Sequence, residues 1–303
     1  MARARTSRGQ DRLWRLEATL FDGFTALMRA LPVDVVSALG GALGRLLGPL
    51  TSAHRTARVN LALAMPELPA PERRRILAEH WDNFGRYLFE FPIADRLTPA
   101  GGRVEVTGFE RLEAIARSGR PAVLISGHFA NIEVMAAVIL AAGIECDVTY
   151  RAANNPYVDR RIIEGRFRYG VRLLAPKGAE GARDLLTSLK AGRSIAMLND
   201  QRYDTGVAGT FFGREVMTLP AGVRLALRFG AVLQPMSVLR LRGARFRVDV
   251  HPPIALQGEG AAGEAAGVAA INAFIEARVR ERPGQWWWMH RRWPAEVYRR
   301  PSA

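Results

Sequence analysis

Strand-like segments alternate with helix-like segments over the last two thirds of the chain, and this alternation constrains the fold more than any other feature. The continuous apolar run Pro121–Ile125 is typical of a strand buried on both faces, whereas Arg245–His251 alternates in polarity. Predicted strands cover Pro121–Ile125, Cys146–Tyr150, Ser194–Leu198, Val232–Leu241 and Arg245–His251. Helical segments cover residues 131–143, 183–191 and 219–229, and a last helix is marked by Val268, Ile271, Ile275 and Val279. The order predicts an α/β fold with a mixed, largely parallel central sheet flanked by helices.

The first 97 residues have a different pattern, which is helical. The clearest helix follows Pro71, where apolar residues recur every three or four positions. Its apolar stripe consists of Leu77, Trp81, Phe84, Leu88 and Phe91. We therefore expect a helical N-terminal region over residues 1–97, part of it bound to a membrane, and an α/β core over residues 98–303, joined as one continuous domain.

The N-terminal region contains no obvious transmembrane helix. Its most apolar stretch is Leu31–Leu50, but Asp34 and Arg45 interrupt it. Three glycines in this stretch recur every four residues, on one helix face: Gly40, Gly44 and Gly48. They permit close packing of helices, either in a membrane or against the body of the protein. The basic start, Met1–Arg12, favours binding to an anionic membrane surface.

The chain is strongly basic, with a net charge of +14 and a pI near 11.1. All but Lys177 and Lys190 of its 43 basic residues are arginine. A GC-rich genome explains arginine over lysine, but the excess charge still indicates an acidic partner: nucleic acid, an anionic membrane or an acidic carrier protein. A nucleic-acid-binding module would concentrate its charge in a stripe or a recognisable motif. The arginines are spread along the whole chain, so we expect no nucleic-acid partner.

A histidine and a glutamate stand five residues apart in Ser126-Gly-His-Phe-Ala-Asn-Ile-Glu133. Histidine is the usual general base near neutral pH and needs a partner that orients its ring. On one straight helix, His128 and Glu133 would point about 140° apart. They meet if His128 lies on the turn after the strand, which Gly127 permits, and Glu133 lies on the first helical turn. We therefore expect Glu133 to orient His128; the alternative is a histidine that only caps or packs, with Glu133 on a solvated helix face.

The same region offers no good nucleophile and no metal site. Ser126 adjoins the histidine, but Ile-Ser-Gly-His lacks the G-x-S-x-G turn of serine hydrolases. The five histidines have no metal-ligand spacing. Cys146, the only cysteine, lies in an apolar run and is expected to be a core residue. These features argue against a serine or cysteine nucleophile and against a zinc site.

Other polar residues follow predicted strands. Asn199-Asp200-Gln201 comes directly after one strand and Arg151 after another. Ligands of open α/β sheets bind beyond the carboxyl ends of the strands, so Asp200 and Arg151 are expected to share a site with His128. The alternatives are that Asp200 only caps a turn and that Arg151 is an ordinary surface residue.

The residues described above resemble those of a known family. Ser126–Glu133 is similar to the H-x4-D/E block of the lysophospholipid acyltransferase superfamily and, more narrowly, of the bacterial lipid A biosynthesis acyltransferases. Five more blocks resemble that family in order along the chain: Arg58–Leu68, Tyr150–Pro156, Asn199–Gln201, Gly209–Gly213 with Pro220, and Gln285–Trp293. Thr210 stands where the family has proline and Met65 where phenylalanine is common.

The resemblance implies transfer of a fatty acyl group from the thioester of acyl carrier protein to a hydroxyl of a lipid A precursor. It implies His128 as general base with Glu133 as its partner, and no cofactor. The residues it implies for substrate binding are Arg151, Asp200, Gln201, Asn131, Phe211, Phe212 and Gly213. Arg151 would bind a lipid phosphate or orient the acceptor. The two phenylalanines would shape an acyl groove, and ordinary core packing is the alternative.

The resemblance also implies a place on the cytoplasmic face of the bacterial inner membrane, held peripherally or as a monotopic protein. Three arginines, Arg166, Arg168 and Arg172, form a basic cluster that would either meet the carrier protein or face solvent. Four tryptophans would form an interfacial belt or pack against the sheet: Trp286, Trp287, Trp288 and Trp293. Two other functions stay open, acylation of a glycerophospholipid or a phosphatidylinositol mannoside, and nucleic-acid binding.

Overall fold

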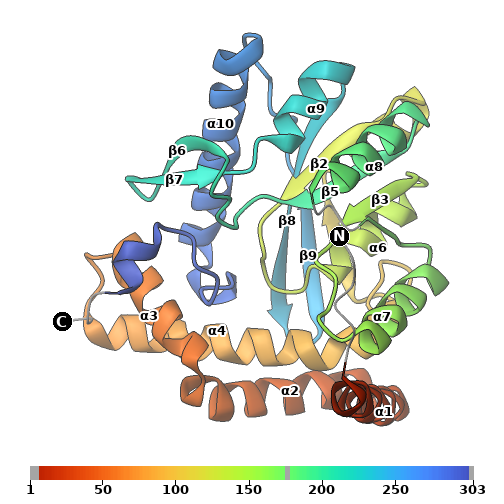
Figure 1. Cartoon of the computed structure of the whole chain (residues 1–303), viewed down its shortest axis with the longest axis vertical. Helices are drawn as coiled ribbons and strands as arrows, with labels where there is room; N and C mark the ends of the chain where they lie inside the picture. The colour runs from red at the N-terminus through yellow and green to blue at the C-terminus, as the bar shows by residue number, and fades with distance from the viewer. Residues whose placement is uncertain (1–6, 175–177, 300–303) are drawn as a thin grey trace.

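A seven-stranded sheet surrounded by helices dominates the computed structural model, which describes residues 7–174 and 178–299 (Figure 1). The strand order is β1-β9-β8-β2-β5-β3-β4. Neighbouring strands are parallel except β8 and β9. The strands are β1 (Val104–Thr107), β2 (Ala122–Ser126), β3 (Cys146–Thr149), β4 (Arg172–Leu174), β5 (Ser194–Leu198), β8 (Val232–Arg242) and β9 (Arg245–Val250). The predicted α/β fold with a largely parallel sheet is confirmed.

Helices cover this sheet, and a separate antiparallel hairpin is formed by β6 (Val207–Phe211) and β7 (Arg214–Thr218). The helices are α1 (Arg8–Ala30), α2 (Val33–Leu47), α3 (Ser52–Ala64), α4 (Ala70–Glu90), α5 (Phe109–Ser118), α6 (Glu133–Ala141), α7 (Pro156–Arg168), α8 (Gly178–Lys190), α9 (Ala221–Phe229) and α10 (Gly260–Glu281). Short 3₁₀ helices are η1 (Gly48–Leu50), η2 (Phe91–Arg96), η3 (Pro283–Gln285) and η4 (Ala295–Tyr298).

All five predicted strands are present, whereas β1, β4, β6 and β7 have no counterpart in the prediction. The three residues of β4 and the four of β1 are too short to establish a period. Helix α7 also lacks a counterpart, because none of its described residues is fully buried and no apolar stripe marks it. Short strands and exposed helices leave little trace in a sequence.

The N-terminal helices pack on the sheet domain through α4, and α2 lies along the outer side of α4 (Figure 1). The glycine stripe of α2 forms this contact. A Cβ atom on Gly44 would stand 2.1 Å from the backbone oxygen of Trp81, and one on Gly85 would stand 2.1 Å from that of Gly40. Of the two expectations for the stripe, the structure therefore shows packing against the body of the protein.

Helix α4 is covered on two sides, which alters its predicted apolar stripe. Leu77 and Trp81 are buried as expected, but Leu88 is 47% exposed. A neighbouring side of the helix is also buried and carries polar side chains, including those of His80 and Glu90. A single-stripe prediction fails here because α2 and the sheet domain contact different faces of one helix.

The main hydrophobic core combines residues of α3 and α4 with the sheet and with the segment after α10. This C-terminal segment returns to the sheet, where Trp286 forms an isolated bridge with Phe129. Trp286, Trp287, Trp288 and Trp293 are all buried. The expectation of an interfacial tryptophan belt is therefore wrong, because these rings pack inside the protein.

Candidate active site

His128 and Asp200 form the centre of the candidate site. Oδ1 of Asp200 lies 2.7 Å from Nδ1 of His128, and Oδ2 accepts a hydrogen bond of 2.7 Å from the backbone N–H of the same histidine. Both residues are buried, and only 11% of the histidine side chain is exposed. The carboxylate thus holds both the ring and the main chain of His128.

The sheet register brings these two residues together. Strands β2 and β5 are parallel neighbours, and the last residue of each, Ser126 and Leu198, are register partners. His128 and Asp200 both stand two residues beyond these strand ends, so they leave the sheet side by side. The backbone N–H of Asn199 donates to the carbonyl of Ser126 at 2.9 Å, which extends the pairing past the strands. The expectation that two strand-end motifs share one place is confirmed.

A second donor holds the Asp200 carboxylate. The indole N–H of Trp286 donates to Oδ2 at 2.7 Å. Burial works to raise the pKa of Asp200, but the charge of His128 and the hydrogen bonds from His128 and Trp286 outweigh it and keep this pKa below its ordinary value. Asp200 is therefore an anion at neutral pH.

The partner of Nδ1 determines which nitrogen of His128 is available for chemistry. A carboxylate only accepts hydrogen bonds, so Nδ1 carries a hydrogen and Nε2 is left with a lone pair in the neutral ring. Nε2 lies 3.4 Å from the side-chain nitrogen of Gln201. Gln201 is exposed. The arrangement places Nε2 of His128 beside a polar side chain that is exposed at the surface.

Glu133 lies where the spacing argument put it, but its contacts differ from the expectation. Helix α6 begins at Glu133, and His128 lies on the turn before it. The carboxylate forms an ion pair with Arg166 of α7 and accepts hydrogen bonds from the hydroxyls of Tyr169, at 3.2 Å, and Tyr87, at 3.4 Å. Asp200, not Glu133, bonds the imidazole.

Aromatic rings separate the two members of the H-x4-E motif. The ring of Trp287 lies 5.0 Å from that of His128 and 4.6 Å from that of Tyr87, whose hydroxyl reaches Glu133. Burial works to lower the pKa of Arg166, but Glu133 outweighs it and holds that pKa above its ordinary value. The expected orienting contact fails because a buried guanidinium competes for the glutamate while Asp200 occupies Nδ1.

Asn131 also differs from the substrate-binding residue that was expected. Its side chain is fully buried, with Oδ1 accepting from the backbone N–H of Glu133 at 3.1 Å and Nδ2 donating to Glu90 at 2.8 Å. Glu90 forms a buried ion pair with Arg240 of β8. Asn131 therefore caps the start of α6 and ties the loop that carries His128 to the interior, so it has no free atom for a substrate.

Arg151 and His290 also lie near this centre. Arg151 is exposed and lies two residues after the end of β3, and none of the ion pairs in the described part of the chain includes it. The His290 ring lies 5.1 Å from that of His128. Burial, with a smaller effect of the charges of His128 and Arg151, lowers the pKa of His290 to about 4.

Phe211, Phe212 and Gly213 form the tip of the β6–β7 hairpin, where Phe212 and Gly213 have positive φ angles of 51° and 68°. Both phenylalanine rings are buried, and Phe211 packs 5.8 Å from Trp286. This position matches the alternative of ordinary core packing.

Cys146 is buried as expected, and burial raises the pKa of its thiol.

The predicted basic cluster is divided by the structure. Arg166 is buried against Glu133, so its place in a solvent-facing or carrier-binding cluster is wrong. Arg168 is exposed at the end of α7, and Arg172 lies 3.7 Å from Asp147.

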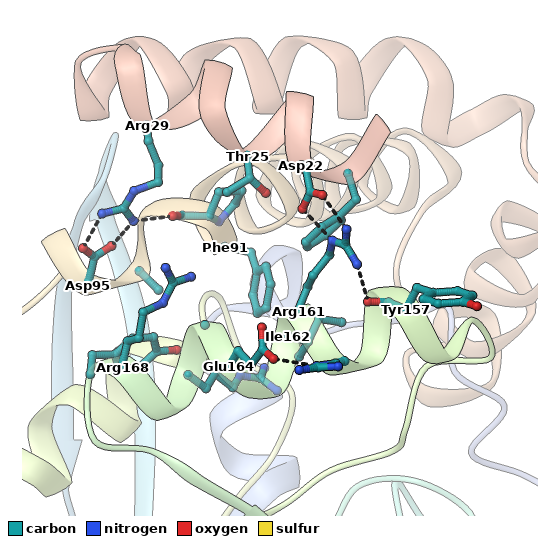
Figure 2. A pocket seen from close by; sticks show the side chains of 17 residues that line it. Asp22, Thr25, Arg29, Phe91, Asp95, Tyr157, Arg161, Ile162, Glu164 and Arg168 are labelled. Carbon is teal, nitrogen blue, oxygen red and sulfur yellow. Dashed lines mark hydrogen bonds and ion pairs between the residues drawn. The ribbon is translucent and has the colours of Figure 1, made fainter. Parts of the chain in front are cut away.

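A pocket of about 630 Å³ lies between α1, η2 and α7 (Figure 2). Ion pairs join α1 to the other two elements, Arg29 to Asp95 and Arg161 to Asp22. Arg166, which binds Glu133, is part of the lining, whereas His128 is not. Glu133 therefore binds a residue that lines this pocket, whereas none of the described hydrogen bonds joins it to the imidazole of His128.

Comparison with known proteins identifies the family of this chain. The sequence profile of the bacterial lipid A biosynthesis acyltransferases matches residues 11–295. The chain belongs to this family. It is 26% identical over 272 residues to a lipid A biosynthesis palmitoleoyltransferase of Escherichia coli (strain K12), with 86% of each chain covered. It is 28% identical over 294 residues to a lipid A biosynthesis lauroyltransferase of the same organism, with 92% of each covered.

One solved structure is also similar, the 1-acyl-sn-glycerophosphate acyltransferase PlsC from Thermotoga maritima. Its TM-score is 0.40 at 13% identity, with 90% of this chain and 99% of that chain covered. A likeness of this size adds nothing to the family assignment.

Sequence reasoning missed the true partner of His128 and the role of the tryptophan segment. Asp200 was identified as a site residue, and the equal offsets of His128 and Asp200 from their strands carried the signal for the pair. No sequence pattern indicated the contacts that Trp286, His80, Arg166 and Tyr169 make around His128 and Glu133. Each of these residues reaches the site from an element far away in the chain.

Proposed function

We propose that this protein transfers a fatty acyl group from the thioester of acyl carrier protein to a hydroxyl of a lipid A precursor. The observation that carries the proposal is a buried histidine whose Nδ1 is held by the Asp200 carboxylate and whose Nε2, with the exposed Gln201 side chain 3.4 Å away, is positioned to act as a base. Family membership supplies the substrate class.

The acceptor hydroxyl would give its proton to Nε2 of His128 while its oxygen attacks the thioester carbonyl carbon. The imidazolium that forms is stabilised by Asp200. When the tetrahedral intermediate collapses, the C–S bond breaks and the leaving thiolate takes the proton back from Nε2. No serine or cysteine is among the hydrogen-bonding partners of His128 in the described residues, so the transfer is direct rather than through an acyl-enzyme.

Arg151 is proposed to bind the acceptor's phosphate or to stabilise the oxyanion of the intermediate. Arg151 is exposed and forms no ion pair within the described ranges. Its charge contributes to the lowered pKa of His290, whose ring lies beside that of His128. A guanidinium binds phosphate oxygens in a bidentate manner. Gln201, next to Nε2, is proposed to contact the acceptor hydroxyl.

The test is an acyl transfer assay with the full-length protein in detergent micelles. Acyl-loaded carrier protein and acyl coenzyme A serve as donors, and a tetraacylated lipid A precursor, lysophosphatidic acid and a phosphatidylinositol mannoside as acceptors. We expect transfer to the lipid A precursor from the carrier protein, abolished by His128→Ala. Activity on lysophosphatidic acid or the mannoside alone would replace the proposed acceptor, and preference for acyl coenzyme A would replace the donor.

We further propose that α1 and α2 hold the protein on an anionic membrane surface. Both helices expose apolar residues at helical spacing: Leu13, Leu16, Leu20 and Leu27 on α1, and Val35, Leu39, Leu43, Leu46 and Leu47 on α2. Exposed Arg8, Arg12 and Arg15 flank the α1 row. By length and composition, Val33–Leu50 is the single described segment that resembles a membrane span. Its glycine face is already packed on α4, which favours a position in the membrane surface over a crossing.

Flotation with lipid vesicles tests this attachment. We expect binding to vesicles that contain phosphatidylglycerol, weaker binding to neutral vesicles, and loss of binding when Leu13, Leu16 and Leu20 are changed to serine. Val232→Ser is the control, because Val232 is also exposed but is the first residue of β8, whereas the last residues of that strand reach α4. Equal binding of all variants would disprove attachment through α1.

A further inference from the structure

We propose that Trp286 is a positioning residue for this acyl transfer, whose indole N–H fixes the Asp200 carboxylate so that it orients His128. The inference rests on the proposed function and adds a third member to the His128–Asp200 pair. Trp286 does not reach the reacting atoms. It acts through the carboxylate.

The two oxygens of Asp200 have different partners. Oδ1 contacts only the ring nitrogen Nδ1 of His128 among the described hydrogen bonds, at 2.7 Å. Oδ2 accepts from the backbone N–H of His128 and from Nε1 of Trp286, each at 2.7 Å. A carboxylate turns easily about its last bond. Two donors on Oδ2 fix its plane, and Oδ1 is thereby directed at the imidazole.

Trp286 is itself held rigidly. It is 1% exposed, and its ring packs against Trp288, with centroids 4.7 Å apart. Its backbone oxygen lies 3.0 Å from Nδ1 of His80, a fully buried residue on α4. Burial lowers the pKa of His80 to about 3, so His80 is neutral and donates from Nδ1 at physiological pH. The indole N–H therefore has a fixed direction.

The residues on either side of Trp286 hold the main chain of the catalytic loop. The backbone N–H of Trp287 donates to the carbonyl of His128 at 3.1 Å, and the carbonyl of Gln285 accepts from the N–H of Ala130 at 2.8 Å. Ala130 has a φ of 39°, which is unfavourable for a residue with a side chain. One three-residue segment thus fixes the backbone of His128 and, through Trp286, its carboxylate partner.

Trp288 provides a matched control within the same segment. It is 0% exposed, and its indole N–H donates to the backbone carbonyl of Pro283 at 2.7 Å. Trp286→Phe and Trp288→Phe each remove one indole N–H from a buried ring and leave a similar void. They differ in the acceptor that is released, a carboxylate at the active centre in one case and a backbone carbonyl in the other.

The experiment compares kcat, KM, the pH profile of kcat/KM and the melting temperature of both variants with those of the unaltered protein. For Trp286→Phe we expect kcat to fall about 10- to 100-fold, the usual effect of one hydrogen bond to a charged group, with little change in KM. The acid limb should move to higher pH, because the carboxylate loses a competing donor and interacts more strongly with the imidazolium. For Trp288→Phe we expect a similar loss of melting temperature, kcat within about twofold and an unmoved acid limb.

Other charged or titratable groups around the centre remain unchanged in both variants. They are His290 and Arg292 from the C-terminal segment, Arg151 after β3 and His80 on α4. A shift of the acid limb seen only in Trp286→Phe is therefore assigned to Asp200.

Equal kcat and equal acid limbs in the two variants would show that Trp286 has only a structural role. If Trp286→Phe does not fold, incorporation of β-(3-benzothienyl)alanine at position 286 keeps the ring shape and removes only the N–H, with the same expected results. The His128→Ala variant separates this inference from the proposed function. Full activity of His128→Ala would overturn the proposed base, whereas an inactive His128→Ala with indistinguishable tryptophan variants would overturn the role of Trp286 alone.

Discussion

Asp200 accepts two hydrogen bonds from His128, one from its backbone N–H and one from its Nδ1, each 2.7 Å long and across a separation of 72 residues. The two contacts couple the conformation of the loop to that of the ring. A change at Asp200 is therefore expected to affect catalysis through the imidazole tautomer as well as through charge.

Asp200→Asn tests this relationship. The amide can still accept from Trp286 and the backbone, but its NH₂ group would face Nδ1 and favour a hydrogen on Nε2, which removes the base. We expect kcat to fall by about 10³-fold or more, as in other histidine–carboxylate pairs, with the melting temperature lowered only modestly. An assay with the acceptor that supports activity in the unaltered protein provides the measurement. A kcat within tenfold of that protein would contradict the assignment of Asp200 as the partner of the base.

Glu133→Ala is expected to act mainly on stability. It leaves the guanidinium of Arg166, whose side chain is only 12% exposed, without its carboxylate. Removing one member of a buried ion pair costs about 3–5 kcal/mol, which denaturant unfolding would measure. The double variant Glu133→Ala/Arg166→Ala should lose less than the sum of the single variants. By contrast, Glu133→Gln with an unchanged melting temperature and a kcat reduced by about 10³-fold would restore Glu133 as the orienting residue.

Gly44→Ala and Gly23→Ala form a matched pair of helical substitutions with opposite expected signs. A Cβ on Gly44 would lie 2.1 Å from the oxygen of Trp81, whereas a Cβ on Gly23 has no atom within 4 Å. We expect Gly44→Ala to destabilise the fold by about 1–3 kcal/mol, because α2 must move away from α4. Gly23→Ala should stabilise it by about 0.5–1 kcal/mol through helix propensity. Thermal unfolding of both variants measures the difference, and equal effects would contradict the close α2–α4 packing.

Acid sensitivity follows from two buried histidines. Burial lowers the pKa of His80 to about 3 and that of His290 to about 4, from ordinary values near 6.5. Above pH 6.5 both are neutral whether the protein is folded or unfolded. Below it the unfolded chain binds protons that the folded chain does not, so the free energy of unfolding falls, by about 1.4 kcal/mol per pH unit for each histidine, until the folded pKa is reached.

Denaturant unfolding between pH 7 and pH 4.5 measures this loss. His80→Asn, whose amide can still donate to the carbonyl of Trp286, should reduce the slope below pH 6 by the contribution of one proton. The same slope in both proteins would show that His80 is protonated in the folded state.

The sequence by itself determined the class of fold and the family, and it indicated His128 as the candidate base. Continuous apolar runs of four or five residues predict buried parallel strands because only such strands need apolar side chains on both faces. The polar residues after Ile125 and after Leu198 indicated a common edge of the sheet, and His128 and Asp200 both lie there. These features are patterns of neighbouring residues, so they can be recognised in the sequence without the tertiary structure.

The partners of His128 and Glu133 were decided only by the tertiary structure. His128 meets Asp200 because β2 and β5 are neighbours in register, a strand order that no local pattern specifies. Glu133 turns away because α7 brings the buried cation of Arg166 to it, although α7 shows no apolar stripe in the sequence. Hydrogen bonds and ion pairs of this kind depend on distances between elements far apart in the chain, and packing of the whole domain sets those distances.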